Sequence, residues 1–317
     1  MIARLTGSTW VRGLLTAGVL VLLATRIDLH ATAASLVRLS PAMAAAVLVL
    51  LGADRGIMIW RWFSLLRATG IRIPLKSAAW IYLVSSFAGT YTALAGDAAR
   101  ALTLTRRNQD GNAAVASVGV DRLLGLVALL VIGLAGAIGA GAAGGTAGLR
   151  TLAVLALLGG AVAPVLLFAD RWLRVALPGG WHRAGLPGRL LRLADAFAQY
   201  RGHRGTLLFV FALSLGVQLL RIVQAYLLGR GIGIDVELSY YLLFMPPGLV
   251  ALMLPISIGG FGAPQALIVW MLQPRGVPEA EAFALSTLIV LSGIVANLPG
   301  ALLFVRRRSP APAAHGS

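Results

Sequence analysis

The stretch Leu254-Pro255-Ile256-Ser257-Ile258-Gly259-Gly260-Phe261-Gly262 interrupts a long apolar run with one proline and three glycines. Proline lacks the backbone donor that a helix needs, and glycine readily adopts non-helical backbone angles. In lipid, each unsatisfied backbone group costs several kcal/mol, so an irregular segment is stable at membrane depth only beside protein or a water-filled cavity. Broken membrane helices often line ligand sites. This stretch is therefore a candidate cavity lining, and a loop at the membrane surface is the alternative.

The composition is that of a polytopic membrane protein. Of the 317 residues, 58% are hydrophobic, and the mean hydropathy is +0.86. No soluble domain of this length hides so much apolar surface. The apolar runs are continuous rather than alternating, which excludes an outer-membrane barrel and predicts an all-α fold.

The chain offers little for cofactor or metal chemistry. It has no cysteine, which excludes disulfides and thiolate metal sites. Its four histidines are scattered near the ends of the apolar runs. Neither a nucleotide-binding loop nor a Ser-His-Asp order is present. We expect no cofactor, no metal and no ATP-driven step.

The charge balance points to the membrane rather than to nucleic acid. The net charge of +16 comes from 27 basic against 11 acidic residues, and Lys76 is the single lysine. In a soluble protein this balance would suggest nucleic acid, but here the arginines gather between apolar runs, as the positive-inside rule predicts. Some of them can also hold anionic lipid headgroups.

The apolar runs predict six full transmembrane helices of about 20 residues each. They cover residues 9–27, 41–66, 113–141, 149–169, 206–230 and 283–305. Two further apolar stretches are interrupted and predict re-entrant hairpins. The first, 77–104, is broken at Gly89-Thr90-Tyr91-Thr92 and at Gly96-Asp97, and the second, 239–273, at Pro246-Pro247-Gly248 and at 255–262.

The arginines orient these segments. Arg61, Arg67 and Arg72 near the end of the second run, seven arginines within 170–205 and three within 306–308 all fall on one side if each hairpin enters and leaves through the same face. By the positive-inside rule that side is the cytoplasm, so both termini are expected to be cytoplasmic in a bacterial inner membrane. The first run has no convincing cleavage site and is expected to be retained as a span.

This topology predicts an inverted repeat. Residues 1–141 and 149–305 each contain two spans, a hairpin and a span, with opposite orientation, which is the layout of many secondary transporters. We expect a single transmembrane domain over residues 1–308, a surface helix near 182–200 and a disordered tail over 309–317.

Ionisable residues inside the apolar segments are candidates for a site, because a charge at the bilayer centre costs about 2.5–3.5 kcal/mol on insertion scales. Asp97 and Arg100 share a helix face and can pair while still presenting donors to a phosphate. Asp121 and Arg122 lie in the first turns of the following span. We expect the four to meet at the cytoplasmic end of a central groove. The alternatives are an N-cap role for Asp97 and simple neutralisation of a neighbouring arginine by Asp121.

A polar stripe is predicted on the span that starts near residue 206. Gln218, Arg221 and Gln224 recur every three residues, which suits a cavity wall, although Arg221 can instead pair with Asp54 or Asp121. At the outer end of the groove, the glycines of the stretch 254–262 are expected to expose backbone donors. The predicted ligand-binding residues are Asp97, Arg100, Asp121, Arg122, Arg221, Gln224, Ser257, Gly259, Gly260 and Gly262.

Three motifs occur together along the chain: Gly96-Asp97-x-x-Arg100, then Ala116-Ser117-Val118-Gly119-Val120-Asp121-Arg122-Leu123-Leu124-Gly125, then the opening stretch 254–262. In this order they resemble the lysylphosphatidylglycerol synthase transmembrane region, a flippase-like family of integral membrane proteins. The resemblance runs over about residues 10–305. One departure is Ala263-Pro264-Gln265, where the family often carries an Arg-Glu pair.

The resemblance implies lipid handling. The best-understood members flip aminoacylated phosphatidylglycerol across the bacterial inner membrane and carry a soluble aminoacyl-transferase domain, which is not found in this sequence. The chain is thus similar to stand-alone members, some of which are associated with isoprenoid-type or hopanoid lipids. The implied function is a lipid flippase or transporter rather than an enzyme, with an anionic phospholipid, an aminoacylated lipid or an isoprenoid-type lipid as its partner.

Two other functions stay open from the sequence. One is a non-transporting membrane scaffold for lipid or envelope biosynthesis. The other is an intramembrane lipid-modifying enzyme with Asp97 or Asp121 as its base, against which stands the absence of a donor-binding domain. Assembly as a homo-oligomer is also left open.

Overall fold

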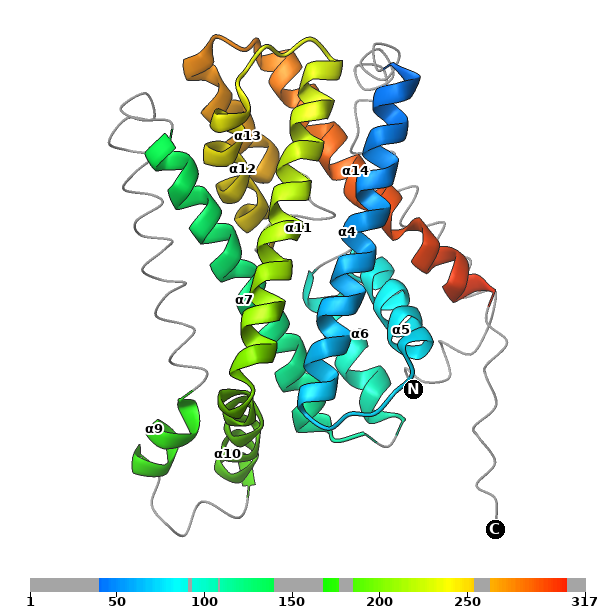
Figure 1. Cartoon of the computed structure of the whole chain (residues 1–317), viewed down its shortest axis with the longest axis vertical. Coiled ribbons are helices and arrows are strands. Elements are labelled where there is room, and N and C mark those ends of the chain that lie inside the picture. Colours follow the sequence, from blue (N-terminus) through cyan, green and yellow to red (C-terminus); the bar gives the residue numbers. More distant parts are fainter. Residues whose placement is uncertain are drawn as a thin grey trace.

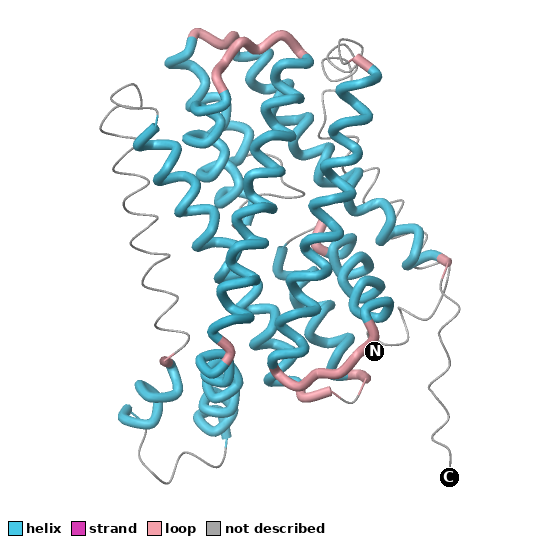
Figure 2. Tube along the Cα trace, viewed as in Figure 1, coloured by secondary structure: helices cyan, strands magenta, loops and turns pink. Residues whose placement is uncertain are grey.

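The computed structural model describes residues 40–90, 93–107, 109–139, 168–176, 185–253 and 263–306. Within these ranges every regular element is a helix (Figure 2), so the all-α prediction is confirmed. The predicted span at 9–27, nearly all of the span at 149–169 and the tail at 309–317 lie outside the described residues.

Four helices are long and apolar enough to cross a membrane. They have 27 to 29 residues each, which corresponds to about 40 Å at 1.5 Å per residue and exceeds the hydrocarbon core of a bilayer. The predicted spans at 41–66, 113–141, 206–230 and 283–305 are therefore confirmed as helices of spanning length. The four are α4 (Pro41–Ala68), α7 (Gly111–Gly139), α11 (Arg204–Gly231) and α14 (Glu279–Val305).

The starts of the long helices follow from local chemistry. Ser40 caps α4, because its hydroxyl accepts a hydrogen bond from the Met43 N–H at 3.3 Å, and a proline occupies the first turn. Asp110 plays the same part for α7, accepting from the Asn112 N–H at 2.8 Å. Glu279 lies in the first turn of α14, where the helix dipole favours a negative charge.

The first interrupted stretch forms two helices, α5 (Leu75–Ala88) and α6 (Ala93–Thr105), separated by a turn at Gly89-Thr90. The second break predicted there, at Gly96-Asp97, is wrong, since α6 runs through it. Gly96 serves close packing instead: a Cβ on this residue would lie 2.8 Å from the Ser85 carbonyl oxygen of α5. The glycine thus lets α6 approach α5.

The second interrupted stretch forms α12 (Leu238–Met253) and α13 (Ala263–Leu272), and the segment between them lies outside the described residues. The break predicted at Pro246-Pro247-Gly248 is wrong, because α12 continues through both prolines. Pro246 deprives the Leu242 carbonyl of its intrahelical donor. That carbonyl faces Gly136 of α7, where an added Cβ would lie 2.5 Å from its oxygen. Neighbouring helices let membrane helices tolerate proline in this way.

The helices pair across the chain (Figure 1). Helices α4 and α11 run side by side, α5 packs on α14, and α12 packs on α7. Gly300 lies at a close contact of the α5–α14 pair, since a Cβ there would collide with the Leu83 carbonyl. The short helix α5 of the segment 41–139 therefore packs against α14, the last helix of the segment 204–305. In the same way, the short helix α12 of the second segment packs against α7, the last helix of the first.

Short helices cover one end of the bundle, below α11 in Figure 1. They are α9 (Ala169–Ala176), α10 (Gly185–Ala198) and the 3-10 helix η3 (Gln199–Gly202). The helix predicted near 182–200 is confirmed. Phe197 of α10 packs against Gly119 of α7.

An ion pair joins α9 to η3. Burial of Asp170 on α9 opposes its ionisation, but hydrogen bonds from Arg201 of η3 at 2.9 and 2.7 Å hold the pKa of Asp170 below its ordinary value.

Candidate functional site

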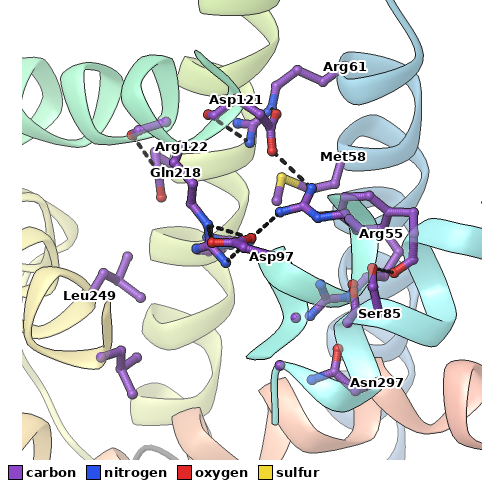
Figure 3. Close-up of a pocket in the computed structure, with 18 residues that line it drawn as sticks. Arg55, Met58, Arg61, Ser85, Asp97, Asp121, Arg122, Gln218, Leu249 and Asn297 are labelled. Carbon is purple, nitrogen blue, oxygen red and sulfur yellow. Dashed lines mark hydrogen bonds and ion pairs between the residues drawn. The ribbon is translucent and has the colours of Figure 1, made fainter. Parts of the chain in front are cut away.

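A polar cavity of about 210 Å³ lies among the helices at mid-height. Gln218 lines it from α11, halfway along the 28 residues of that helix. All four long helices and the short helices α5, α6 and α12 contribute to its wall (Figure 3). The charged side chains of the wall are Arg55, Arg61, Asp97, Arg100, Asp121, Arg122 and Arg221.

Asp97 of α6 lies between two arginines. It accepts a hydrogen bond from Nη2 of Arg100, one turn further along the same helix. It also accepts from Nε of Arg122 on α7 at 2.9 Å and from Nη2 of Arg122 at 3.1 Å. Asp97 therefore joins α6 to α7 by charge-assisted hydrogen bonds, which are stronger than neutral ones. The alternative of an N-cap is wrong, because Asp97 lies four residues after the start of α6.

Asp121 of α7 is the most deeply buried charge of the cavity, with 1% of its surface exposed. Nε of Arg61 on α4 donates to its Oδ1 at 2.7 Å, and Nη1 of Arg100 lies 3.3 Å from its Oδ2. Arg100 thus bridges the two aspartates. The structure thus brings Asp97, Arg100, Asp121 and Arg122 together, as expected. Their placement at the cytoplasmic end of a groove stays a prediction.

Arg61 was missed as a site residue. The positive-inside rule predicts that Arg61 is one of the cytoplasmic charges. The side chain is instead only 3% exposed and also donates to Ser214 of α11 at 3.0 Å. A usable signal existed: Asp54 and Arg61 are seven residues apart, which is two helical turns, so they share one face of α4. Two ionisable groups on one face of an apolar helix indicate a polar interior.

Aromatic rings hold Arg100 in place. Its guanidinium carbon lies 5.0 Å from the centre of the Tyr82 ring and 5.6 Å from that of Trp62. Both distances are within the range of cation–π attraction. Close packing of α6 on α5 at Gly96 brings the arginine to these rings. The guanidinium is therefore fixed between two carboxylates and two aromatic faces.

The predicted polar stripe of α11 lines the cavity and a neighbouring one. Arg221 pairs with Asp54, its Nε lying 2.8 Å from Oδ1, which selects the first of the two predicted partners. Gln218 donates to the Gly125 carbonyl of α7 at 3.1 Å. Gln224 lines a second cavity, of about 160 Å³. The three-residue spacing thus predicted a cavity wall correctly.

Several buried polar atoms around these cavities have no hydrogen-bond partner within the described part of the chain. Leaving such an atom unsatisfied costs about 1–3 kcal/mol, so water or a polar ligand is expected beside it. Both donors and acceptors are present, and they come from three helices. The atoms are Nε of Arg55, Oε1 of Gln218 and Oδ1 of Asn297 at the first cavity, and Nε2 of Gln224 at the second.

The charge of the first cavity suits an anion. Five arginines and two aspartates line it, which leaves three positive charges, and the Asp54 partner of Arg221 reduces these to two. Arginine forks match the oxygens of phosphate and carboxylate groups. Met58, Leu249 and Leu252 add an apolar part to the wall. Among the described residues, no group of histidine or acidic side chains could hold a metal ion.

The four remaining predicted ligand-binding residues all belong to the stretch 254–262. Ser257, Gly259, Gly260 and Gly262 lie outside the described residues. Gln265, at the position where the resemblance leads one to expect charge, is buried and donates to the Thr287 hydroxyl at 3.0 Å. It therefore ties α13 to α14.

The family model described as "Lysylphosphatidylglycerol synthase TM region" matches residues 9–300, so the resemblance carried by the three motifs is confirmed. No match was found among curated proteins. Together with the four helices of spanning length, the match identifies a multi-pass membrane protein.

Proposed function

The chain belongs to the lysylphosphatidylglycerol synthase TM region family, and from this premise we propose that it is a lipid flippase or transporter. Its cargo is an anionic or modified lipid of the bacterial inner membrane: an anionic phospholipid, an aminoacylated lipid or an isoprenoid-type lipid phosphate. The headgroup enters the cavity while the acyl or isoprenoid chains stay in the bilayer.

One observation carries this proposal: a cationic cavity lies at mid-height among helices that are otherwise apolar. A lipid phosphate cannot cross the hydrocarbon core unaided, because a bare charge there is costly. Arg100 and Arg122 lie at the cavity and can replace the water shell of a phosphate with fixed donors. Arg122 is the more open of the two, with 38% of its side chain exposed, and is the first contact of an entering headgroup.

The helix pairing supports an inverted repeat. Helix α5 of the first segment corresponds to α12 of the second, and α7 corresponds to α14. Because α5 packs on α14 and α12 packs on α7, the two contacts are related by the same exchange of segments. At both crossings a glycine of the long helix, Gly300 or Gly136, lies against a backbone carbonyl of the short helix. On this view α5–α6 and α12–α13 are the two re-entrant hairpins, and both termini are cytoplasmic. Such repeats place the cargo site where the halves meet, near the bilayer midplane.

Lipid movement in proteoliposomes tests the proposal. Purified protein is reconstituted with fluorescent phosphatidylglycerol, and dithionite bleaching reports the label that reaches the outer leaflet. Arg100→Ala is expected to reduce the rate at least about tenfold, because it removes a donor worth about 1.5–3 kcal/mol to a charged group. Arg106→Ala, which removes an equal charge from the exposed end of α6, is the control and is expected to keep the wild-type rate.

The outcomes separate the proposal from its alternatives. A folded wild-type protein that moves no phosphatidylglycerol, aminoacylated phosphatidylglycerol or isoprenoid phosphate would favour a scaffold. Chemical conversion of the added lipid, detected by mass spectrometry, would favour a lipid-modifying enzyme. Equal rates for Arg100→Ala and the wild type would remove the cavity from the transport path.

A further inference from the structure

Two cavities follow one another along α4 and α11, and Arg55 and Arg221 belong to the walls of both. From these residues the first cavity extends to Arg61 of α4 and the second to Leu51. Ten residues separate these two limits, which corresponds to about 15 Å along a helix. The two cavities therefore meet at the level of Arg55 and Arg221.

In the part of the chain that the structure describes, the carboxylate that faces both arginines at this boundary is Asp54. Nε of Arg221 donates to Oδ1 of Asp54 at 2.8 Å. Nε of Arg55 lies 3.8 Å from Oδ2 of the same carboxylate, which is beyond hydrogen-bond distance. This Nε is buried and has no hydrogen-bond partner among the residues that the structure describes. Among the described acidic residues, Asp54 alone lies within ion-pair distance of these two arginines, and it hydrogen-bonds to only one of them.

Unpartnered amides lie on either side of the boundary. Gln218 is 2% exposed and Gln224 is 6% exposed, and each has one amide atom that finds no partner in the described ranges. Nε2 of Gln224 is a donor in the second cavity, one turn of α11 beyond Arg221. Each oxygen of a phosphate can accept more than one hydrogen bond, and arginine recognises phosphate in a bidentate manner, so one phosphate can accept from this amide and from both arginines.

We propose that Arg55, Arg221 and Gln224 form a second anion subsite, for the phosphate of a phosphate ester, and that Asp54 occupies it as an internal counter-anion until the phosphate displaces it. The expectation that this phosphate belongs to a lipid rests on the proposed function. Without a counter-anion the empty boundary would hold two desolvated cations, which is costly. Asp54 therefore stabilises the empty protein and competes with the ligand.

Removal of the competing charge tests this subsite. Asp54→Asn keeps the shape of the side chain and removes its charge. In lipid-free maltoside micelles, calorimetric titration with sodium phosphate or with phosphatidylglycerol is expected to give a Kd about tenfold lower than that of the wild type, because one repelling charge is gone. The double variant Asp54→Asn/Arg221→Gln is expected to lose this gain.

Asp235→Asn is the control. It makes the same change in net charge at an exposed pair with Arg230, at the far end of α11. Its Kd for both ligands is expected to equal that of the wild type. A gain with phosphate alone identifies a subsite for free phosphate, and a gain with phosphatidylglycerol identifies the headgroup of a lipid; either supports the subsite. An unchanged Kd for both ligands in Asp54→Asn, or an equal gain in Asp235→Asn, overturns it.

Stability supplies a second measurement if Asp54→Asn does not survive purification in chloride. Phosphate in the extraction buffer is then expected to restore its melting temperature, because the anion takes the place of the lost carboxylate. Failure of phosphate to restore it overturns the subsite. Lipid movement by the wild type is measured separately. If the wild type moves lipid but Asp54→Asn gains no affinity, the subsite fails alone; if Asp54→Asn gains affinity but the wild type moves no lipid, the transport proposal fails alone.

Discussion

Arg61 and Arg100 both pair with Asp121, but removing one or the other leaves different groups without a partner. Without Arg61, Asp121 keeps a single hydrogen-bond donor among the described side chains, Arg100 at 3.3 Å, and Ser214 loses the donor at 3.0 Å while it still donates to the Val210 carbonyl. Without Arg100, Asp121 keeps Arg61 at 2.7 Å and Asp97 keeps Arg122. Arg61 is therefore the more structural of the two.

Unfolding of the purified variants in mixed micelles measures this difference. Arg61→Ala is expected to lower the free energy of unfolding by about 3–5 kcal/mol, as for a broken buried ion pair. Arg100→Ala is expected to lower it by about 1.5–3 kcal/mol, the worth of hydrogen bonds to a charged group. Equal losses of unfolding free energy in the two variants would contradict the larger structural role of Arg61.

Part of the site followed from local spacing in the sequence. Asp97 and Arg100 are three residues apart, and the stripe of Gln218, Arg221 and Gln224 repeats every three residues, so a helix brings each set to one face. Arg61 was missed because the positive-inside rule counts arginines near the end of a span and takes no account of a carboxylate on a facing helix. Partners that are 60 residues apart in the chain become visible only when α4 packs on α7.

At the scale of the elements, the crossing of α5 and α14 gives a test of helix packing. Gly300→Ala is expected to lower the melting temperature, because the new Cβ meets the backbone carbonyl of Leu83 and the helices must separate. Gly293→Ala on the same helix meets nothing within 4 Å. It is expected to leave the melting temperature unchanged or to raise it, since alanine favours a helix over glycine by about 0.8–1.0 kcal/mol.

Thermal unfolding in detergent compares the two variants. Overpacking commonly costs about 1–3 kcal/mol, and a carbonyl of the backbone yields less readily than a side chain. A Gly300→Ala protein as stable as Gly293→Ala would show that α5 does not lie against α14 as described.

Glycine and proline were harder to interpret than the apolar runs. The four long helices were predicted within a few residues, because a continuous apolar run of that length has few alternatives. Gly96 and Pro246 both predict helix breaks, yet each lies inside a helix. Helix α5 approaches closely at Gly96, and α7 approaches the Leu242 carbonyl one turn before Pro246. Whether such a residue breaks a helix or admits a neighbour depends on the neighbour, which periodicity does not reveal.

For the whole molecule, the topology can be tested with introduced cysteines, since the chain has none of its own. Helix α11 joins the end that holds α10 to the opposite end, so residues on either side of it lie far apart. Asp235→Cys is expected to react with an impermeant maleimide added to intact cells, and Arg189→Cys only after the membrane is opened. The reason is the group of seven arginines within 170–205, which favours the cytoplasm.

A cysteine near residue 145 is expected to react like Asp235→Cys. If positions 145 and 235 are labelled from outside and position 189 is protected, the result agrees with two oppositely oriented segments. Labelling of position 189 from outside would exclude the inverted repeat and the cytoplasmic placement of residues 170–205.

The crossed pairing of α5 with α14 and of α12 with α7 limits how the protein can move. At each crossing a glycine lies directly against a backbone carbonyl of the other segment: Gly300 against that of Leu83, and Gly136 against that of Leu242. A rigid-body rotation of one segment against the other must separate or compress these two close contacts unless its axis passes through both of them, and packed interfaces do not deform continuously. The two crossings therefore oppose hinge motion between the segments. They favour movements of single helices and side chains within a frame that keeps both crossings intact.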